Sequence, residues 1–408
     1  MSLDKKIHIA IVTVWFPPRI GVAVNRMHAF AQYLHASGMK ISVIALQESL
    51  EIPAKEDLNE ITVIRVPNKV VFKRAKFYPG EPKLKHLVKA GWNLFSARVN
   101  PLQESGWMNE AIRELNILHE NNKIDLVISS FSPSEAHLAA LYFLGKYPNV
   151  KWVADMRDEM SMNKLLPSLI QKNLARYEKQ ISKRADAITS VSKPILDQFR
   201  ELMPDVEHFL EVRNGYNHNL TFETNFNLKF TIVYAGSFYG IIKPCTFFQG
   251  LKAALIKQKF DFEIIFVGTH HNFQIPQEFA SNCRFVPKVS QLESIEFMAK
   301  SDANLLILPN DQRKGVYSGK LFDYLSVKKP IIAVVDPEDV AAQLIKDLNA
   351  GFIADFNQTE EISNAILSAY FLWKNKEKLN LNDHEIELLH RKHQVKKLEL
   401  LIRKIIVS

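Results

Sequence analysis

The chain has 408 residues, with 52 Lys and Arg against 44 Asp and Glu, a formal net charge of +8, and a hydrophobic content of 47%. This length exceeds one ordinary hydrophobic core, and the composition is that of a soluble globular protein, so two α/β domains are expected. Two distant cysteines, Cys245 and Cys283, exclude a disulfide framework and a zinc-ligand spacing, which fits a reducing cytosol.

The first half of the chain predicts alternating strands and helices. Residues 7–14 form an apolar, β-branched run that ends before Pro17 and Pro18, as expected of a strand buried on both faces. Lys5 and Lys6 before this run suggest a signal peptide, but the run contains His8 and lacks a small-residue cleavage site, which favours a strand. The expected strands are residues 7–14, 41–46, 61–66, 126–130, 153–156 and 187–191, and the expected helices are residues 27–36, 107–120, 137–144 and 165–184.

The same pattern restarts at residue 230. The expected strands are residues 230–235, 262–267, 283–286, 303–308 and 331–335, the expected helices are residues 246–256, 291–299 and 340–348, and residues 360–408 read as helical and strongly charged. The two halves meet near residues 217–230. We therefore expect an α/β protein with two Rossmann-like domains, residues 1–220 and 221–385, facing each other across a cleft.

The segment GVYSGKLFDYLSVKKP, residues 315–330, reads as a loop, a helix and the approach to a strand. A helix N-terminus exposes unpaired N–H groups and a positive dipole end, which suits a phosphate, and Lys320 adds a full charge there. Asp323, about one turn further on, could accept hydrogen bonds from sugar hydroxyls. An ordinary helix start in an α/β domain explains the same residues, and the segment alone does not decide between the two.

Ligands of such sheets bind at the carboxyl ends of the strands, where the strand order switches. The loop after the first strand holds one glycine and no complete GxGxxG, so a dinucleotide fingerprint is not supported, although the glycine lets a backbone approach a ligand. The candidates at strand ends are Gly21, Arg157 and Asp158 in the first half and Gly236, Lys243, Gly268 and Gly319 in the second.

The positive charge is concentrated in residues 69–98, where Glu81 is the single acid. The basic residues are Lys69, Lys73, Arg74, Lys76, Lys83, Lys85, Lys89 and Arg98, and aromatic and aliphatic residues lie between them. A solvated loop and helix face would look like this. So would a surface that binds an anionic membrane, at about 1 kcal/mol per basic residue. Nucleic acid would also be attracted, but no nucleic-acid module is recognisable, so we expect no nucleic acid and rank the membrane first.

Several segments, in order along nearly the whole chain, resemble one known family. They are PPRIGV after the first strand, VADMRDE, ADAITSVSKPI, VRNGYN, VYAGSFYGIIKP and SGKLFDYLSVKKPII. Each is weak alone, but together they resemble the retaining glycosyltransferases of the two-Rossmann-domain architecture called GT-B, in the large group numbered family four. VADMRDE resembles the bacterial surface-polysaccharide members. In this architecture the last helix, here residues 386–408, commonly crosses back onto the first domain.

The resemblance implies a nucleotide-sugar donor bound mainly by the second domain. The loop after Gly236 and Lys243 would lie near the diphosphate, the backbone of Ser318 and Gly319 would hold phosphate oxygens, and Asp323 stands where the family has a ribose-binding glutamate. The donor-binding residues expected on this basis are Gly21, Gly236, Ser237, Tyr239, Lys243, Ser318, Gly319, Lys320 and Asp323.

The chain departs from the family pattern at two places. The family's second glutamate falls eight positions before Asp323, at Gly315, which leaves the donor sugar open. Many members have a histidine near the reacting sugar, and the local match here is Arg157 followed by Asp158. Arg157 could neutralise phosphate charge and Asp158 could take a proton from an acceptor hydroxyl, or the two could form a structural ion pair. His137 could face the cleft, but packing against a helix is the commoner use.

The function implied is hexosyl transfer, with retention, to a hydroxyl of a glycan or lipid-linked acceptor in cell-surface polysaccharide synthesis. No cofactor and no metal are expected beyond the nucleotide-sugar substrate, because Lys243, Lys320 and helix N-termini can neutralise the leaving phosphate. The expected location is the cytoplasm, peripheral to the inner face of the plasma membrane. A sugar-nucleotide epimerase of the same architecture and a catalytically degenerate, donor-binding relative stay open as alternatives.

Overall fold

The computed structural model describes residues 6–69, 75, 81–99, 102, 104–222, 226–238, 242–269, 273–309 and 313–407. The chain forms two compact units, Met1–Val212 together with Val395–Ser408, and Arg213–Gln394, and each has its own sheet. The ends of these units, Val212 and Gln394, differ from the limits 220 and 385 suggested by the sequence. No helix in the described part of the chain has the length and apolarity to cross a membrane.

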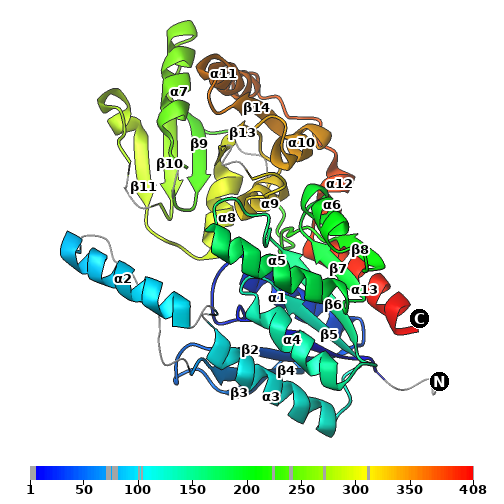
Figure 1. Ribbon diagram of the computed structural model, residues 1–408. Helices are drawn as coiled ribbons and strands as arrows, with labels where there is room; N and C mark the ends of the chain where they lie inside the picture. Colours follow the sequence, from blue (N-terminus) through cyan, green and yellow to red (C-terminus); the bar gives the residue numbers. More distant parts are fainter. Residues whose placement is uncertain are drawn as a thin grey trace. The chain divides into compact units, whose positions relative to one another are not determined.

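The first unit is built on a sheet whose described strands follow the order β3-β4-β2-β1-β5-β6-β7-β8 (Figure 1). All neighbouring strands are parallel except β3 and β4, which are antiparallel. The strands are β1 (His8–Val12), β2 (Lys40–Gln47), β3 (Lys55–Leu58), β4 (Ile61–Pro67), β5 (Leu126–Ser130), β6 (Lys151–Arg157), β7 (Ala187–Ser190) and β8 (His208–Glu211).

Helices cover both faces of this sheet because alternate side chains of a strand point to opposite faces. Ala10 and Val12 of β1 pack in one hydrophobic cluster with α3, α4, α5 and α6, whereas Ile9 and Ile11 pack in another with α1 and α13. The helices are α1 (Val22–Ala36), α2 (Lys83–Val99), α3 (Ser105–Asn121), α4 (Glu135–Lys146), α5 (Ser168–Ser182), α6 (Lys193–Leu202) and α13 (Arg391–Val407).

The second unit has a parallel sheet with the described order β11-β10-β9-β12-β13-β14. Its strands are β9 (Phe230–Ala235), β10 (Phe262–Val267), β11 (Cys283–Val286), β12 (Ala303–Leu308), β13 (Ile331–Val335) and β14 (Gly351–Asp355). The helices α8, α9, α10 and α12 pack on one face, and α7 and α11 on the other. They are α7 (Cys245–Lys257), α8 (Gln291–Lys300), α9 (Gly319–Ser326), α10 (Val340–Asp347), α11 (Thr359–Asn375) and α12 (Asp383–Leu388), with a 3₁₀ turn at Gln277–Asn282.

The predicted fold class is therefore confirmed: the protein is α/β, with two Rossmann-like units. In each sheet the chain order reverses at one pair of central strands, β1 and β5 in the first unit and β9 and β12 in the second. The crevice outside the carboxyl ends of such a pair is where ligands of open α/β sheets bind. These two positions define where each unit is to be searched for a site.

Candidate functional site

At the switch point of the second unit, the end of β9 lies beside the start of α9. Gly236 directly follows β9 and has φ 99°, a left-handed conformation that favours glycine. A Cβ atom on Gly236 would lie 3.5 Å from the Nζ atom of Lys320, the second residue of α9. Two of the predicted donor-binding residues, far apart in sequence, are thus brought together at the expected edge of the sheet.

The side chain of Lys320 lies over the end of strand β9, at Tyr234. Its Nζ donates a 2.7 Å hydrogen bond to the Tyr234 hydroxyl and lies 3.9 Å from the centre of the Tyr234 ring. Burial lowers the pKa of Lys320 to about 7. No carboxylate forms an ion pair with Lys320 among the residues that the structure describes. A desolvated cation of this kind favours an incoming anion, because the anion restores the charge that burial disfavours.

The N-terminus of α9 carries no competing negative charge. Ser318 is the N-cap, its side chain makes no capping hydrogen bond, and the first turn holds no acidic residue. The helix begins with Gly319 and Lys320, so the positive end of the helix dipole and the ammonium group of Lys320 lie within one turn of each other. This combination suits a phosphate group.

Asp323 lies about one turn into α9 and is half-buried. Burial raises its pKa to about 6, while the charge of Arg391 and a hydrogen bond with Gln291 oppose the rise. Arg391 in turn donates from Nε to the carbonyls of Asn214 (2.8 Å) and Gly215 (3.1 Å). Asn214 and Gly215, within the quoted segment VRNGYN, therefore hold a cation whose charge acts on Asp323, and nothing in the sequence alone pointed to Arg391 there.

The remaining donor-binding candidates lie around Gly236. The Ser237 hydroxyl donates to the carbonyl of Gly268 (3.3 Å), and the Thr269 hydroxyl donates to the carbonyl of Gly236 (2.6 Å). Lys243 is exposed, just before α7. Tyr239 lies outside the described residues.

Gly315, where the family pattern has a glutamate, adopts φ 86°. Its backbone N–H donates to the carboxylate of Asp339 (2.8 Å), which also accepts a hydrogen bond from the backbone N–H of Val340 at the start of α10. A side chain at this left-handed position is strained, so the backbone conformation itself favours glycine over glutamate.

In the first unit, Gly21 precedes α1, and Arg157 and Asp158 lie at the end of β6. A Cβ atom on Gly21 would meet nothing within 4 Å. Arg157 has φ 45° and donates from Nε to the Asp158 carboxylate at 2.8 Å. The Asp158 side chain remains 49% exposed, so the ion pair weighed in the sequence analysis exists and its carboxylate is also accessible from solvent.

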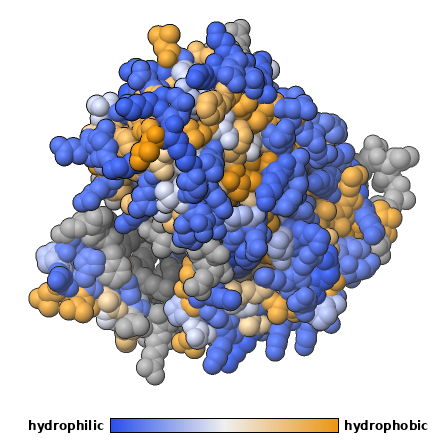
Figure 2. All heavy atoms as spheres, turned by 90° about the horizontal axis from the view of Figure 1, so that it is seen from above, coloured by the Kyte–Doolittle hydropathy of each residue, from blue (hydrophilic) through white to orange (hydrophobic). Residues whose placement is uncertain are grey.

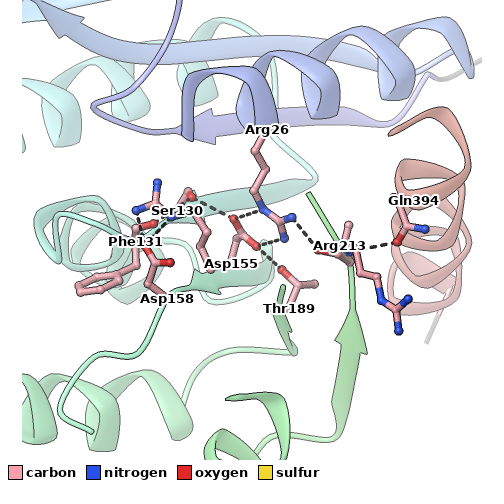
Figure 3. A network of polar contacts seen from close by, with 10 residues as sticks. Arg26, Ser130, Phe131, Asp155, Asp158, Thr189, Arg213 and Gln394 are labelled. Carbon is pink, nitrogen blue, oxygen red and sulfur yellow. Dashed lines mark hydrogen bonds and ion pairs between the residues drawn. The ribbon is translucent and has the colours of Figure 1, made fainter. Parts of the chain in front are cut away.

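A buried network at the carboxyl end of the first sheet was not predicted (Figure 3). Arg26 of α1 donates from Nε and Nη2 to the two oxygens of Asp155, at 3.0 and 2.7 Å. The hydroxyls of Ser130 and Thr189 also donate to Asp155, and Arg26 donates to the carbonyl of Val212. Burial opposes ionisation of Asp155, but the charge of Arg26 and these hydrogen bonds keep its pKa below the usual value. The network fixes the ends of β5, β6 and β7 around α1.

The sequence contained a weak signal for this network. Asp155 lies inside the quoted segment VADMRDE, and Arg26 directly follows the loop that holds Gly21. Neither residue was distinguishable from a solvent-facing charge without the fold.

His137 is buried within the packing of the first unit. Its Nδ1 is hydrogen-bonded to the Ser129 hydroxyl at 2.7 Å, and that hydroxyl accepts a hydrogen bond from the Trp152 indole. Burial lowers the pKa of His137 to about 4. These contacts are those of a packed histidine. Within the described residues, no group of three His, Cys, Asp or Glu side chains is placed to hold a metal ion.

No protein-family model matches the sequence, and no curated protein sequence matches it. Solved structures do match over the whole chain. Sucrose-phosphate synthase from Thermosynechococcus elongatus superposes with a TM-score of 0.66 at 12% identity, over 99% of this chain and 100% of that one. A structure from E. coli described as trehalose-6-phosphate bound with UDP-2-fluoro glucose gives 0.60 at 11% identity, over 98% and 99%.

A putative UDP-N-acetylglucosamine 2-epimerase from Listeria monocytogenes also matches, with a TM-score of 0.55 at 11% identity, over 98% of this chain and 96% of that one. The chain has the GT-B fold. At these identities the matches establish the fold and leave the reaction to be argued from the site.

Proposed function

We propose that this protein is a glycosyltransferase that moves a sugar from a nucleotide-sugar donor to a hydroxyl of a glycan or lipid-linked acceptor. The observation that carries the proposal is the desolvated ammonium of Lys320 beside Gly236, at the start of α9 and at the switch point of the second unit. The similar structures include a synthase that makes a sugar phosphate and one bound with a UDP-sugar analogue, which supports a nucleotide-sugar donor.

The chemical task is to stabilise the diphosphate as it leaves. Departure of the diphosphate builds negative charge on its oxygens, and donors already oriented at those oxygens stabilise the transition state. Lys320 and the N–H groups of Ser318 and Gly319 supply such donors at one helix start. Lys243 adds charge from the loop before α7, so the proposed reaction needs no metal.

Asp323 would bind the hydroxyls of the ribose. Its carboxylate follows the proposed phosphate-binding start of α9 by about one turn, is hydrogen-bonded with Gln291 and is subject to the charge of Arg391. Gly236, Ser237 and Tyr239 would form the loop that contacts the donor. Gly21, before α1 of the first unit, would let the backbone approach the donor.

Arg157 and Asp158 of the first unit would act on the acceptor. The Asp158 carboxylate is accessible and paired with Arg157, so it can position an acceptor hydroxyl and take its proton. By resemblance the enzyme is a cytoplasmic, retaining, family-four hexosyltransferase of cell-surface polysaccharide synthesis.

Nucleotide binding tests the site directly. A ligand that binds the folded state raises the melting temperature by mass action, so a panel of nucleoside diphosphates and nucleotide sugars identifies the base. The variant Lys320→Met should lower the affinity of the selected nucleotide by about 10- to 100-fold, as expected for loss of a charge-assisted hydrogen bond. Lys252→Met, an exposed lysine of α7 paired with Glu278, is the matched control and should bind as the wild type does.

Product analysis separates the reactions. A transferase releases nucleoside diphosphate in proportion to acceptor glycosylated, whereas an epimerase converts the nucleotide sugar without any acceptor. Binding without turnover of any donor would favour a degenerate, donor-binding protein. Equal nucleotide affinity of Lys320→Met and the wild type would remove the proposed site.

A further inference from the structure

Helix α2 of the first unit exposes its apolar side chains. Leu84, Leu87 and Val88 are 74, 69 and 66% exposed, and Trp92 and Phe95 are 41 and 51% exposed. In Figure 1, α2 (cyan) stands apart from the sheet of its own unit. Figure 2, a view from above, shows hydrophobic side chains (orange) at its left edge, and α2 also lies at the left in Figure 1. We call these five residues the α2 apolar face.

The helix is amphipathic, but its apolar side is the exposed one, the opposite of a helix that packs on a core. At about 100° per residue, the α2 apolar face and Gly91 fall within an arc of about 140°. The opposite arc contains His86, Lys89, Ala90, Asn93 and Ser96. These residues are the less exposed ones, so α2 keeps its polar side toward the chain and its apolar side toward solvent.

Hydrogen bonds join the polar side of α2 to the segment that precedes it. The Asn93 side chain accepts from the backbone N–H of Ala75 (2.7 Å) and donates to its carbonyl (3.0 Å). Lys89 donates to both oxygens of Glu81 at 2.5 and 2.6 Å. These contacts cover the polar side of α2 with Ala75 and Glu81, and the apolar face stays exposed.

The positive charges of Lys83 and Lys85 beside the α2 apolar face favour an anionic partner. Lys83 and Lys85 are exposed and lie about 100° to either side of Leu84, at the two borders of the apolar face. Glu81, the single acid of residues 69–98, is within ion-pair distance of Lys89 and Lys85. Lysines beside an apolar face that includes a tryptophan suit the headgroup level of an anionic bilayer.

We propose that the α2 apolar face binds the surface of an anionic lipid bilayer, with Lys83 and Lys85 at the headgroups. The helix lies in the plane of the interface, with Leu84, Leu87 and Phe95 among the upper acyl chains. This binding needs no nucleotide or acceptor, so it stands independently of the proposed reaction.

Vesicle sedimentation of the full chain tests the proposal. The wild type should sediment with vesicles of phosphatidylglycerol and phosphatidylcholine, and much less with phosphatidylcholine alone. The double variant Leu84→Gln, Leu87→Gln should partition about tenfold less. The double variant Lys83→Gln, Lys85→Gln should lose about fivefold per lysine, and only on anionic vesicles. Ile256→Gln, an equally exposed apolar residue of α7, is the matched control and should partition as the wild type does.

Fluorescence reports the orientation of the helix. Anionic vesicles should shift the tryptophan emission of the wild type to shorter wavelength, and Trp92→Phe should lose that shift. Undiminished sedimentation of the Leu84, Leu87 variant would overturn the proposal. So would a dimer in sedimentation velocity that this variant dissociates, because the face would then belong to a second copy of the chain.

Discussion

The guanidinium of Arg26 forms two parallel hydrogen bonds with the carboxylate of Asp155, and both side chains are almost completely inaccessible to solvent. Asp155 lies two residues before Arg157 on β6, with a register irregularity between them. The buried pair thus fixes the end of β6 from which Arg157 and Asp158 extend.

Arg26→Met should lower the free energy of unfolding by about 3–5 kcal/mol, because it leaves the Asp155 carboxylate buried without its counter-ion. Urea unfolding measures the change. Arg200→Met is the matched control, since Arg200 pairs with Asp197 on the surface, and its cost should stay within about 1 kcal/mol. Equal midpoints for the two variants would show that the buried pair is not what holds this sheet end together.

Lys320 should lower the stability of the free protein. Its folded pKa of about 7 lies below the unfolded value, so the wild type gains stability as pH rises from about 7 toward about 10.5. Lys320→Met should therefore be more stable than the wild type by about 1–2 kcal/mol at pH 6, and the difference should shrink by pH 9. Thermal unfolding at both pH values, with Lys252→Met as control, measures it. A Lys320→Met variant less stable than the wild type at pH 6 would contradict a desolvated ammonium.

The pKa values of Lys320 and Asp323 together predict the pH range of donor binding. Above about pH 7 the free protein holds Lys320 neutral, so binding a diphosphate requires proton uptake and affinity should fall with rising pH. Below about pH 6 Asp323 is protonated and loses its charge-assisted bond to the ribose. Affinity should peak between these values.

Calorimetry with a nucleotide sugar measures this profile, because the diphosphate diester has no phosphate group that titrates near pH 6. Lys320→Met should lose the alkaline limb and Asp323→Asn the acidic limb. A profile that is flat from about pH 5 to about pH 9 would count against both assignments, because this range spans the pKa values of both groups.

Much of the fold was predictable because buried parallel strands are continuous apolar runs. The sequence did not predict β3, since KEDL is polar and lies at an edge of the sheet with alternating exposure. It did not predict β14 either, and this edge strand is mostly half-buried. An edge strand faces solvent more than a central one and carries a weaker hydrophobic pattern.

The candidate site was predictable only where local chemistry is visible along the chain. Lys320 and Asp323 follow a glycine at a helix start, which the sequence displays directly. Arg391 approaches Asp323 from the last helix, and Arg26 reaches Asp155 from helix α1, 129 residues away in the sequence, so only the folded chain brings these partners together. Residues 69–98 favoured a membrane-binding surface already from the sequence. Which side of α2 is exposed came only from the fold, because hydrophobic periodicity indicates an amphipathic helix without saying which side faces the chain.

Gly315→Glu, which introduces the carboxylate of the family pattern, should not improve donor turnover. Gly315 adopts φ 86°, so a side chain there costs about 1 kcal/mol or more, and its N–H is held by the Asp339 carboxylate that also bonds the start of α10. Gly315→Ala should show the same loss of thermal stability, which separates the backbone cost from the added charge. Gly145→Ala is the control, since Gly145 lies in α4 with open space at its Cβ position and should be stabilised slightly. A Gly315→Glu variant that is as stable as the wild type and turns over donor faster would contradict this. It would show that the chain has lost a catalytic carboxylate here and that the backbone does not require glycine.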